Sequence, residues 1–461
     1  MSMSMSTGLI SGMDTGTLIT QLMQVEAQPQ TLLKTQLSSA QAGATAYRAV
    51  NTRFDGLRAA AEALTQNSTW TSTKATSSAA AATATAGAGA VAGQLSFTVD
   101  SVATNHSVIS QASWAAMDTA YGSSTISVTV GATTTAVPIT GQGGKPPTLA
   151  DAVASINAST AGLTATAVQV SAGKYQLQVT AKDSGTAATF SLDTPGAFAV
   201  VTDGANARLT VGTGAGKYQV TSTTNDFVGL LGGTTVSVNA VSASPVTVKV
   251  TSDPDAVAAK VTSLVTAING LLDAVTSYTA SGNSTAVLKG DSTLRSLASQ
   301  VLSTVSSAVG TTSPAVAGLQ LTKDGHVTFD STTFVAKLKS DPALVQRIFA
   351  GTVTTAGPDA VLGSADDVTA PSGTAARLQA LAKAASDSTT GTLTLLATSS
   401  DTKATDFQAR IDDWDIRLAL RKDTLTRQFT AMETALGTLH NQASWLTSQI
   451  AQLPSWSSSK N

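Results

Sequence analysis

The residue types that most often carry chemistry are sparse and scattered in this sequence. Its three histidines, His106, His326 and His440, lie far apart, and none belongs to an HExxH motif or another metal-binding spacing. An isolated histidine lacks the further ligands that a bound metal ion needs. We therefore interpret each of the three as a structural residue.

A second group of candidate ligands lies in the glycine-containing segment 357–367. Asp359, Asp366 and Asp367 could together chelate Ca²⁺ through carboxylate oxygens, although their spacing is not that of an EF-hand loop. The simpler interpretation is an exposed loop. The sequence also lacks a P-loop, a GxSxG nucleophile elbow, a dinucleotide-binding fingerprint and any cysteine. It therefore predicts no enzyme and no cofactor, and we assign no metal site.

Composition narrows the choice of partners. The 461 residues are 42% hydrophobic but only 4% aromatic and 12% charged, and the net charge is -2. This charge argues against nucleic acid as a partner, because no basic excess exists to neutralise phosphates. No run of about 18 apolar residues indicates a membrane span. The first residues lack the features of a cleaved signal peptide, so export is expected to use another route.

The clearest structural pattern is one long amphipathic helix, predicted from Asp406 to Leu453. Its apolar residues recur mostly at alternating intervals of three and four, which is typical of a coiled-coil seam. Arg421 occupies the one vacant seam position, within two successive four-residue steps, and Pro454 ends the helix. Such a helix needs a partner for its apolar stripe. The stripe consists of Phe407, Ile411, Trp414, Leu418, Leu425, Phe429, Met432, Leu436, Leu439, Ala443, Leu446, Ile450 and Leu453.

The beginning of the sequence supplies a candidate partner. Asp14 or Thr15 is predicted to cap a helix with one apolar face, and Pro29 should break or kink it. A second amphipathic run then continues to about residue 66. The simplest prediction is that these helices pack against the helix at 406–453. The alternative is two independent helices in separate bundles.

Between the terminal helices, residues 79–252 have the pattern of β-structure. Alternating apolar and polar residues are separated by Gly, Asn and Asp turns at nearly regular spacing, which predicts two small subdomains. Thr148 is predicted to cap a short helix within this block. Residues 71–93 are of low complexity, and we interpret them as a linker or a loosely specified strand.

From Asp253-Pro254 onward, the pattern is again mainly helical. Asp291 and Asp341 are predicted to begin two of the helices. A hairpin is expected at Leu319–Phe329, because Lys-Asp-Gly supplies its turn. Residues 351–372 are predicted to form a loop before the next helix.

Charged residues cluster on the predicted C-terminal helix. The spacing of Asp413 and Arg417 predicts an ion pair between them. The cluster either sets the register between two helices or forms a solvated face. Trp414 and Trp445 on the same helix are either core residues or anchors of an interface. The cluster comprises Arg410, Asp412, Asp413, Asp415, Arg417, Arg421 and Lys422.

Several blocks of the sequence, taken in order, resemble a single family. Ile10–Met23 is similar to the N-terminal signature of that family, and Glu26 and Pro29 match its acidic and proline positions. Together the blocks resemble the flagellar hook-associated protein 2 family, the filament-cap proteins of bacterial flagella. The β-rich middle resembles it least. The other similar blocks are Ser244–Val250, Lys289–Arg295, Leu319–Phe329, Asp341–Phe349 and the helix from Arg410 to Leu446.

The resemblance implies an α+β multidomain fold. In that fold the terminal helices form a coiled-coil leg, a helical stalk domain follows, and β-rich head subdomains are inserted between the helices. The implied domains are residues 1–45 with 425–461 for the leg, 46–78 with 253–424 for the stalk, 79–121 with 204–252 for one head subdomain, and 122–203 for the distal one.

The resemblance also implies a function and a set of partners. The chain would cap the extracellular tip of the flagellum after type III export, guiding flagellin assembly and preventing the leakage of exported monomers. The implied partners are further copies in a ring-like homo-oligomer (a pentamer), flagellin, hook–filament junction proteins, and an export chaperone on the C-terminal helix. The alternatives are another flagellar axial protein, such as a junction protein or a flagellin-like protein, and a surface adhesin with a β head on a helical stalk.

On this basis we predict an oligomer or filament interface along the terminal helices. The part near Trp414 would pack on the helical domain, and the part from Phe429 to Leu453 would form the leg. Arg421, between these parts, is a candidate hinge. The predicted interface residues are Leu18, Leu22, Leu37, Trp414, Leu425, Phe429, Leu436, Trp445 and Leu446.

Overall fold

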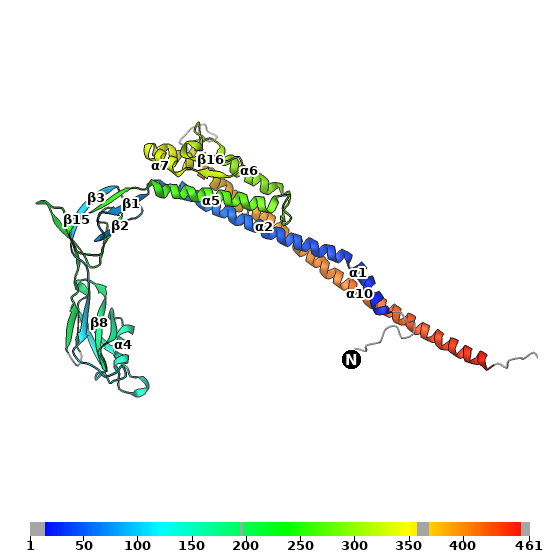
Figure 1. Ribbon diagram of the computed structural model, residues 1–461, viewed down its shortest axis with the longest axis horizontal. Coiled ribbons are helices and arrows are strands. Elements are labelled where there is room, and N and C mark those ends of the chain that lie inside the picture. Colours follow the sequence, from blue (N-terminus) through cyan, green and yellow to red (C-terminus); the bar gives the residue numbers. More distant parts are fainter. Residues whose placement is uncertain (1–13, 194–196, 357–367, 453–461) are drawn as a thin grey trace, which may run out of the picture. The chain divides into compact units, whose positions relative to one another are not determined.

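The protein consists of two units, one mainly helical and one mainly β (Figure 1). The structure, a computed structural model, describes residues 14–193, 197–356 and 368–452. Residues 1–65 with 260–461 form the helical unit, and residues 66–259 form the β unit. This mixed architecture confirms the predicted α+β class.

Two long helices organise the helical unit. α2 (Gln28–Thr65) and α10 (Thr392–Ala451) run side by side (Figure 1), which confirms the predicted pairing of the terminal helices. α1 (Thr15–Glu26) precedes α2 and also contacts α10. Asp14 caps α1 by accepting a hydrogen bond from the Thr17 amide at 3.0 Å. The helix is interrupted before Pro29, as predicted, because proline has no amide hydrogen to donate.

Shorter helices complete this unit. α9 packs against α2, α6, α8 and α10, and several of its alanines are fully buried, which allows close approach. Asp291 and Asp341 cap α6 and α8 by accepting bonds from amides at 2.9 and 3.1 Å, as predicted. The expected hairpin at 319–329 is present as β16 (Leu319–Leu321) and β17 (Val327–Phe329). The shorter helices are α5 (Pro254–Thr279), α6 (Ser292–Ser306), α7 (Ser331–Ser340), α8 (Pro342–Ala350) and α9 (Thr374–Ser386).

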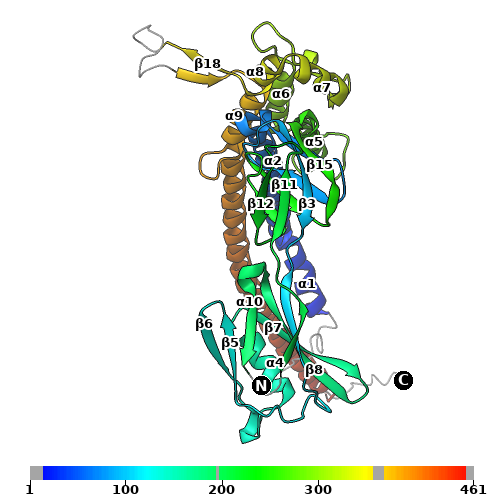
Figure 2. The ribbon, with the colours of Figure 1, turned by 90° about the vertical axis from the view of Figure 1, so that its left-hand side faces the viewer.

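Two predictions about this unit were wrong. α10 begins at Thr392, well before Asp406, because Leu393 and Ala397 extend its buried stripe through a Thr- and Ser-rich stretch that hides the pattern. Residues 351–372 are not all loop, since β18 (Thr352–Thr355) pairs with β19 (Val368–Pro371). Their threonines and valines favour strands. This hairpin projects from the ends of α8 and α9 (Figure 2).

Within the described residues, α5 alone is long and apolar enough to meet the criteria for a membrane-spanning helix. Its apolar face is nevertheless occupied inside the protein, where Val261, Leu264, Ile268 and Leu271 are buried. A helix that is buried in the core of a globular domain can have this same length and composition. We therefore interpret α5 as a core helix.

The first part of the β unit contains two antiparallel sheets around one core. The five-stranded sheet has the order β1-β15-β3-β11-β12, and the three-stranded sheet has the order β13-β14-β2. Alternate residues such as Phe97, Val99 and Val248 point into the core, as the period of two requires. β1 and β2 lie in the low-complexity segment, so that segment forms defined strands. The strands are β1 (Thr73–Ser77), β2 (Ala82–Ala86), β3 (Gly93–Ser101), β11 (Ala207–Val211), β12 (Tyr218–Ser222), β13 (Asp226–Val228), β14 (Thr234–Val238) and β15 (Ser242–Ser252).

The second part of the β unit has a separate core. Its sheets have the orders β10-β4-β8-β7 and β6-β5-β9, and α4 (Leu149–Ala158) packs on β7. Thr148 and Asp151 form a reciprocal capping box at α4, which confirms the predicted cap. Trp114 and Tyr121 also belong to this core. The four-domain division remains a prediction. The strands are β4 (Asn105–Ser110), β5 (Thr125–Val130), β6 (Thr133–Pro138), β7 (Leu163–Ser171), β8 (Lys174–Ser184), β9 (Phe190–Asp193) and β10 (Phe198–Thr202).

Candidate functional site

The candidate site is the surface of the helices near the two ends of the chain. α2 and α10 bury small and large apolar residues against their surroundings, among them Ala44 and Val50 on α2 and Ala397 and Ile411 on α10. Alanines at such positions let helix backbones approach closely and leave less apolar area to bury. The pair therefore combines a continuous contact with a seam less apolar than an unbroken row of leucines.

A polar contact is built into this helix pair. The Gln30 side chain is 6% exposed, and its Nε2 donates to the Asp415 Oδ1 atom at 2.5 Å. The Lys34 Nζ atom donates to the Gln30 Oε1 atom at 3.3 Å, which satisfies the amide oxygen. A buried amide needs such partners, because losing its water contacts without replacement is costly. The contact therefore favours one register of α2 against α10.

Two ion pairs also join segments that are distant in sequence. The Arg421 Nε atom lies 3.1 Å from the Glu26 Oε1 atom, so the residue in the vacant seam position reaches the end of α1. Arg48 on α2 pairs with Asp401 on α10. All four side chains are substantially exposed, so these pairs contribute mainly to orientation and little to stability.

The predicted ion pair between Asp413 and Arg417 was wrong. The Arg417 guanidinium lies over the Trp414 ring, with its central carbon 5.7 Å from the ring centroid. A guanidinium stacked on an indole gains from the negative face of the ring and from the contact area. Residues three and four positions apart on a helix are both neighbours, so Arg417 can reach either Trp414 or Asp413. Sequence spacing alone did not show that Arg417 contacts Trp414.

The structure divides the predicted interface residues by their exposure. Leu425 is buried between helices, and Leu18, Leu22, Trp445 and Leu446 are exposed. The other four predicted interface residues are half-buried, so each keeps some apolar surface in water. The half-buried residues are Leu37, Trp414, Phe429 and Leu436. Their part in an oligomer or filament interface remains a prediction.

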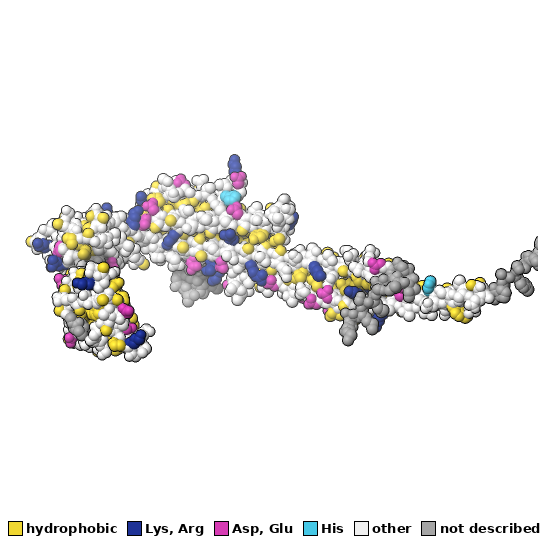
Figure 3. Space-filling view, turned by 60° about the horizontal axis from the view of Figure 1, so that its bottom comes forward, with side chains coloured by type: hydrophobic (Ala, Val, Ile, Leu, Met, Phe, Trp, Pro, Cys, Tyr) yellow, Lys and Arg dark blue, Asp and Glu magenta, His cyan; other side chains and the backbone are white. Residues whose placement is uncertain are grey.

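The last turns of α10 carry an apolar surface that faces solvent. Leu439, Trp445, Leu446 and Ile450 are 54–63% exposed. Figure 3 shows hydrophobic side chains at the surface in this region. Leu439, Leu446 and Ile450 belong to the apolar stripe, and Trp445 lies beside it. Large exposed apolar side chains gathered in this way are typical of a surface that binds another protein.

The histidines have separate surroundings. His106 is buried edge-on against Phe190, with ring centroids 5.0 Å apart. The His326 Nε2 atom lies 3.0 Å from the Asp273 Oδ1 atom, and this hydrogen bond raises the pKa of His326. His440 is exposed on α10. The described residues contain no group of three His, Cys, Asp or Glu side chains placed to hold a metal ion. Asp359, Asp366 and Asp367 lie outside the described residues.

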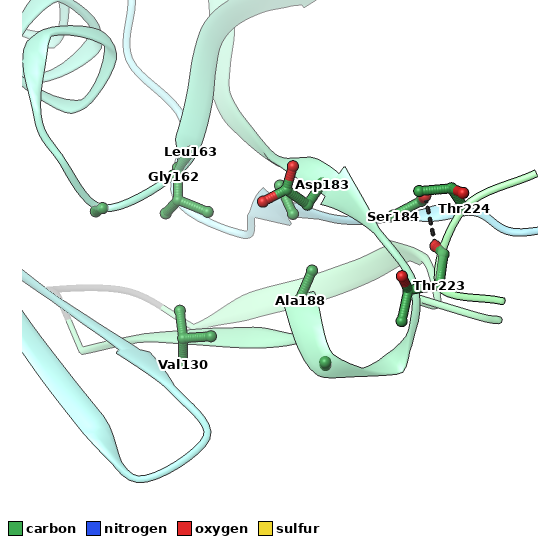
Figure 4. A pocket seen from close by; sticks show the side chains of 11 residues that line it. Val130, Gly162, Leu163, Asp183, Ser184, Ala188, Thr223 and Thr224 are labelled. Atoms are coloured by element: carbon green, nitrogen blue, oxygen red, sulfur yellow. Dashed lines mark hydrogen bonds between the residues drawn. The ribbon is translucent and has the colours of Figure 1, made fainter. Parts of the chain in front are cut away.

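A pocket of 390 Å³ lies in the β unit (Figure 4). Its wall includes Val130, Leu163 and Asp183, and the Ser184 hydroxyl donates to the Thr223 carbonyl at 2.7 Å. Among the described residues that line it, Asp183 is the only titratable one. The pocket therefore lacks a paired nucleophile and base within that lining.

Helices from both ends of the sequence, a β unit between them and an exposed apolar helix end together define a structural assembly protein. The family model for the C-terminus of flagellar hook-associated protein 2 matches residues 204–441, and the model for its N-terminus matches residues 11–106. The chain belongs to the flagellar hook-associated protein 2 family. It is thus a filament cap protein, located at the extracellular tip of the bacterial flagellum.

Individual relatives agree with this membership. Proteins named flagellar hook-associated protein 2 from two strains of Escherichia coli are each 27% identical over 487 aligned positions, covering 96% of this chain and 97% of the relative. The crystal structure of the flagellar cap protein FliD D1-D2-D3 domains from Escherichia coli is 22% identical with a TM-score of 0.56, covering 77% of this chain and 99% of that one. This likeness shows a shared fold.

Proposed function

We propose that the chain acts as one subunit of an oligomeric cap that guides flagellin into the filament and prevents exported monomers from leaking. The observation that carries this proposal is the apolar stripe of α10, which continues beyond its buried positions. Trp445, Leu446 and Ile450 remain exposed there. Full burial of one such side chain contributes about 1.5–3 kcal/mol, which favours binding of this stripe to another protein.

The same surface could serve the partners that the family resemblance implies. We propose flagellin and the hook–filament junction proteins as partners of the leg, and an export chaperone as the partner of the C-terminal helix before assembly. Further copies of the chain would complete a ring-like homopentamer. The small residues that α10 buries, such as Ala397 and Gly437, support a contact of moderate strength that can release and rebind as subunits are added.

The proposed role involves no catalysed reaction. Capping needs shape, exposed binding surface and reversible contacts, which the helical unit offers. Asp14 and Asp291 serve as helix caps, and Arg421 and Glu26 form an ion pair. Family membership does not favour the junction-protein, flagellin-like and adhesin alternatives.

Complementation of a strain that lacks its own cap gene tests the proposal. The parent chain should restore filaments and retain flagellin. The double variant Trp445→Ser, Leu446→Ser should leave flagellin in the medium, because the exposed apolar surface is lost. This result is read only where the variant itself is found outside the cell, which shows that its export is intact. Leu395→Ser removes a similarly exposed residue near the start of α10 and is the matched control. Filaments of parental length with the double variant would show that the end of α10 is not the binding surface.

A further inference from the structure

A groove opens on the helical unit beside the break between α1 and α2. It has a volume of 340 Å³, and its apolar walls are Pro29, Leu32, Leu33 and Trp414. Leu32 is 60% exposed, so the groove keeps apolar surface in water. We call these four residues, with the charges at their rim, the Trp414 groove.

The rim of the Trp414 groove carries a cationic excess. Arg410 and Arg417 line it together with one carboxylate, that of Asp413. Arg417 lies over the Trp414 ring and is paired with no carboxylate among the described residues. An apolar groove with this rim fits an aliphatic side chain that is flanked by a carboxylate.

The same stretch of α10 presents a stripe with the complementary chemistry. Asp412, Ile416 and Leu420 are spaced by four residues and therefore lie on one face. Ile416 and Leu420 are 62% and 63% exposed, so both keep a large apolar surface in water. Asp412 accepts a bond from the neutral Gln408 amide at 2.8 Å, so its charge is not balanced there. We call these three residues the Ile416 stripe.

The groove and the stripe face different directions on one helix. Trp414 and Ile416 are two residues apart, which rotates their side chains by about 200° around the helix axis. One copy can therefore use its groove while a neighbouring copy uses its stripe. Such a contact is heterologous, and repetition of it produces a closed ring or an open filament of copies.

We propose that the Trp414 groove of one copy binds the Ile416 stripe of a second copy. Ile416 or Leu420 enters the groove, and Asp412 faces Arg410 and Arg417. This inference rests on the proposed self-assembly and assigns the residues that carry part of it. A contact made through one groove and one stripe is far smaller than a standard interface, so by itself it is weak and releasable.

The absence of cysteine from the sequence permits a direct test by disulfide crosslinking. One full-length chain carries Leu32→Cys in the groove, and a second carries Ile416→Cys in the stripe. Tags of different size distinguish the two chains, which are then mixed. After mild oxidation, the yield of the disulfide-linked heterodimer from this mixture should exceed the yield of homodimer from either variant alone. Leu395→Cys on α10 is the matched control, because Leu395 is 56% exposed and lies in neither surface. Leu32→Cys is mixed with Ile416→Cys in the test and with Leu395→Cys in the control. Equal heterodimer yields from the two mixtures would overturn the proposal.

Charge reversal tests the electrostatic part of the contact. Arg417→Glu in the groove chain, or Asp412→Arg in the stripe chain, should each lower the crosslink yield about threefold. Both changes together, one in each chain, should restore it. Arg53→Glu makes the same charge change at an exposed site of α2 and should have no effect. Lack of restoration with both changes would refute the assigned charge pairing.

Complementation separates this inference from the proposed function. If the parent chain restores filaments but Arg417→Glu neither lowers crosslinking nor shortens filaments, the inference fails and the cap function stands. If the parent chain itself does not restore filaments in a strain lacking its cap gene, the proposed function fails. Circular dichroism of each variant confirms that α10 remains folded.

Discussion

Arg421 reaches across to Glu26, with 3.1 Å between the Arg421 Nε atom and the Glu26 Oε1 atom. Glu26 is the last residue of α1, and Arg421 occupies the seam position that lacks an apolar residue. One ion pair thus marks the point where the chain changes from α1 to α2, opposite a continuous α10.

Arg421→Ala is expected to loosen α1 without unfolding the helical unit. Both partners are 40–49% exposed, so the loss of stability should be below about 1 kcal/mol. Amide hydrogen exchange in residues 15–26 should accelerate. Arg427→Ala is the control, because Arg427 pairs with Asp423 inside α10. Unchanged exchange in α1 would mean that other contacts position this helix.

Gln30→Ala is expected to lower the free energy of unfolding by about 1–2 kcal/mol, because it removes a buried amide with two partners. Chemical denaturation followed by circular dichroism measures this change. Gln36→Ala makes the same substitution at an exposed position of α2 and should change little. Equal effects of the two substitutions would argue against a special role for Gln30.

Tyr47→Phe is expected to cost about 1 kcal/mol, since the Tyr47 hydroxyl donates to the Asp291 Oδ2 atom at 2.6 Å. Burial, followed by the bond and charge of Asp291, raises the pKa of Tyr47 above its usual value. A raised pKa gives stability that is complete below the unfolded value of about 10 and is lost as the pH rises further. The parent should therefore lose stability above pH 10 more steeply than Tyr47→Phe. Denaturation of both proteins at pH 8 and pH 11 measures how much free energy of unfolding each loses between these pH values. An equal loss in the parent and in Tyr47→Phe would contradict the assignment.

Asp387→Ala is expected to fray the turn before α10. The Asp387 carboxylate accepts bonds from the amides of Thr390 at 2.8 Å and Thr389 at 3.0 Å, and these bonds hold its pKa well below the usual range. A lowered pKa gives stability that is present at neutral pH and lost as the solution is acidified through the folded value. Amide exchange at Thr389 and Thr390 should accelerate in the variant at pH 7. Ser388→Ala in the same turn should leave that exchange unchanged.

Local patterns allowed much of the fold to be predicted. Caps at Thr148, Asp291 and Asp341 were identified correctly, and Asp14 was one of the two candidates named for α1, because a cap depends on only a few neighbouring residues. The pairing of terminal helices also followed from the period of their apolar residues. The start of α10 was missed because its first turns present threonine, serine and alanine.

Contacts within the candidate site were harder to predict. Gln30 and Asp415 are 385 positions apart, and nothing in either local sequence links them. Arg417 had two possible partners at helical spacing, Asp413 and Trp414, and the choice depends on side-chain rotamers. The Trp414 groove is lined by residues of α2 and α10, so it depends on how these two helices meet.

The β unit begins and ends on neighbouring strands. Thr73 on β1 stands opposite Ser252 on β15, and the Asp253 amide donates to the Ser72 carbonyl at 2.8 Å. Opposite residues of antiparallel strands have Cα atoms only about 5 Å apart. As long as β1 and β15 stay paired, the segment between them can therefore change in length without altering the spacing of the chain segments that flank the two strands.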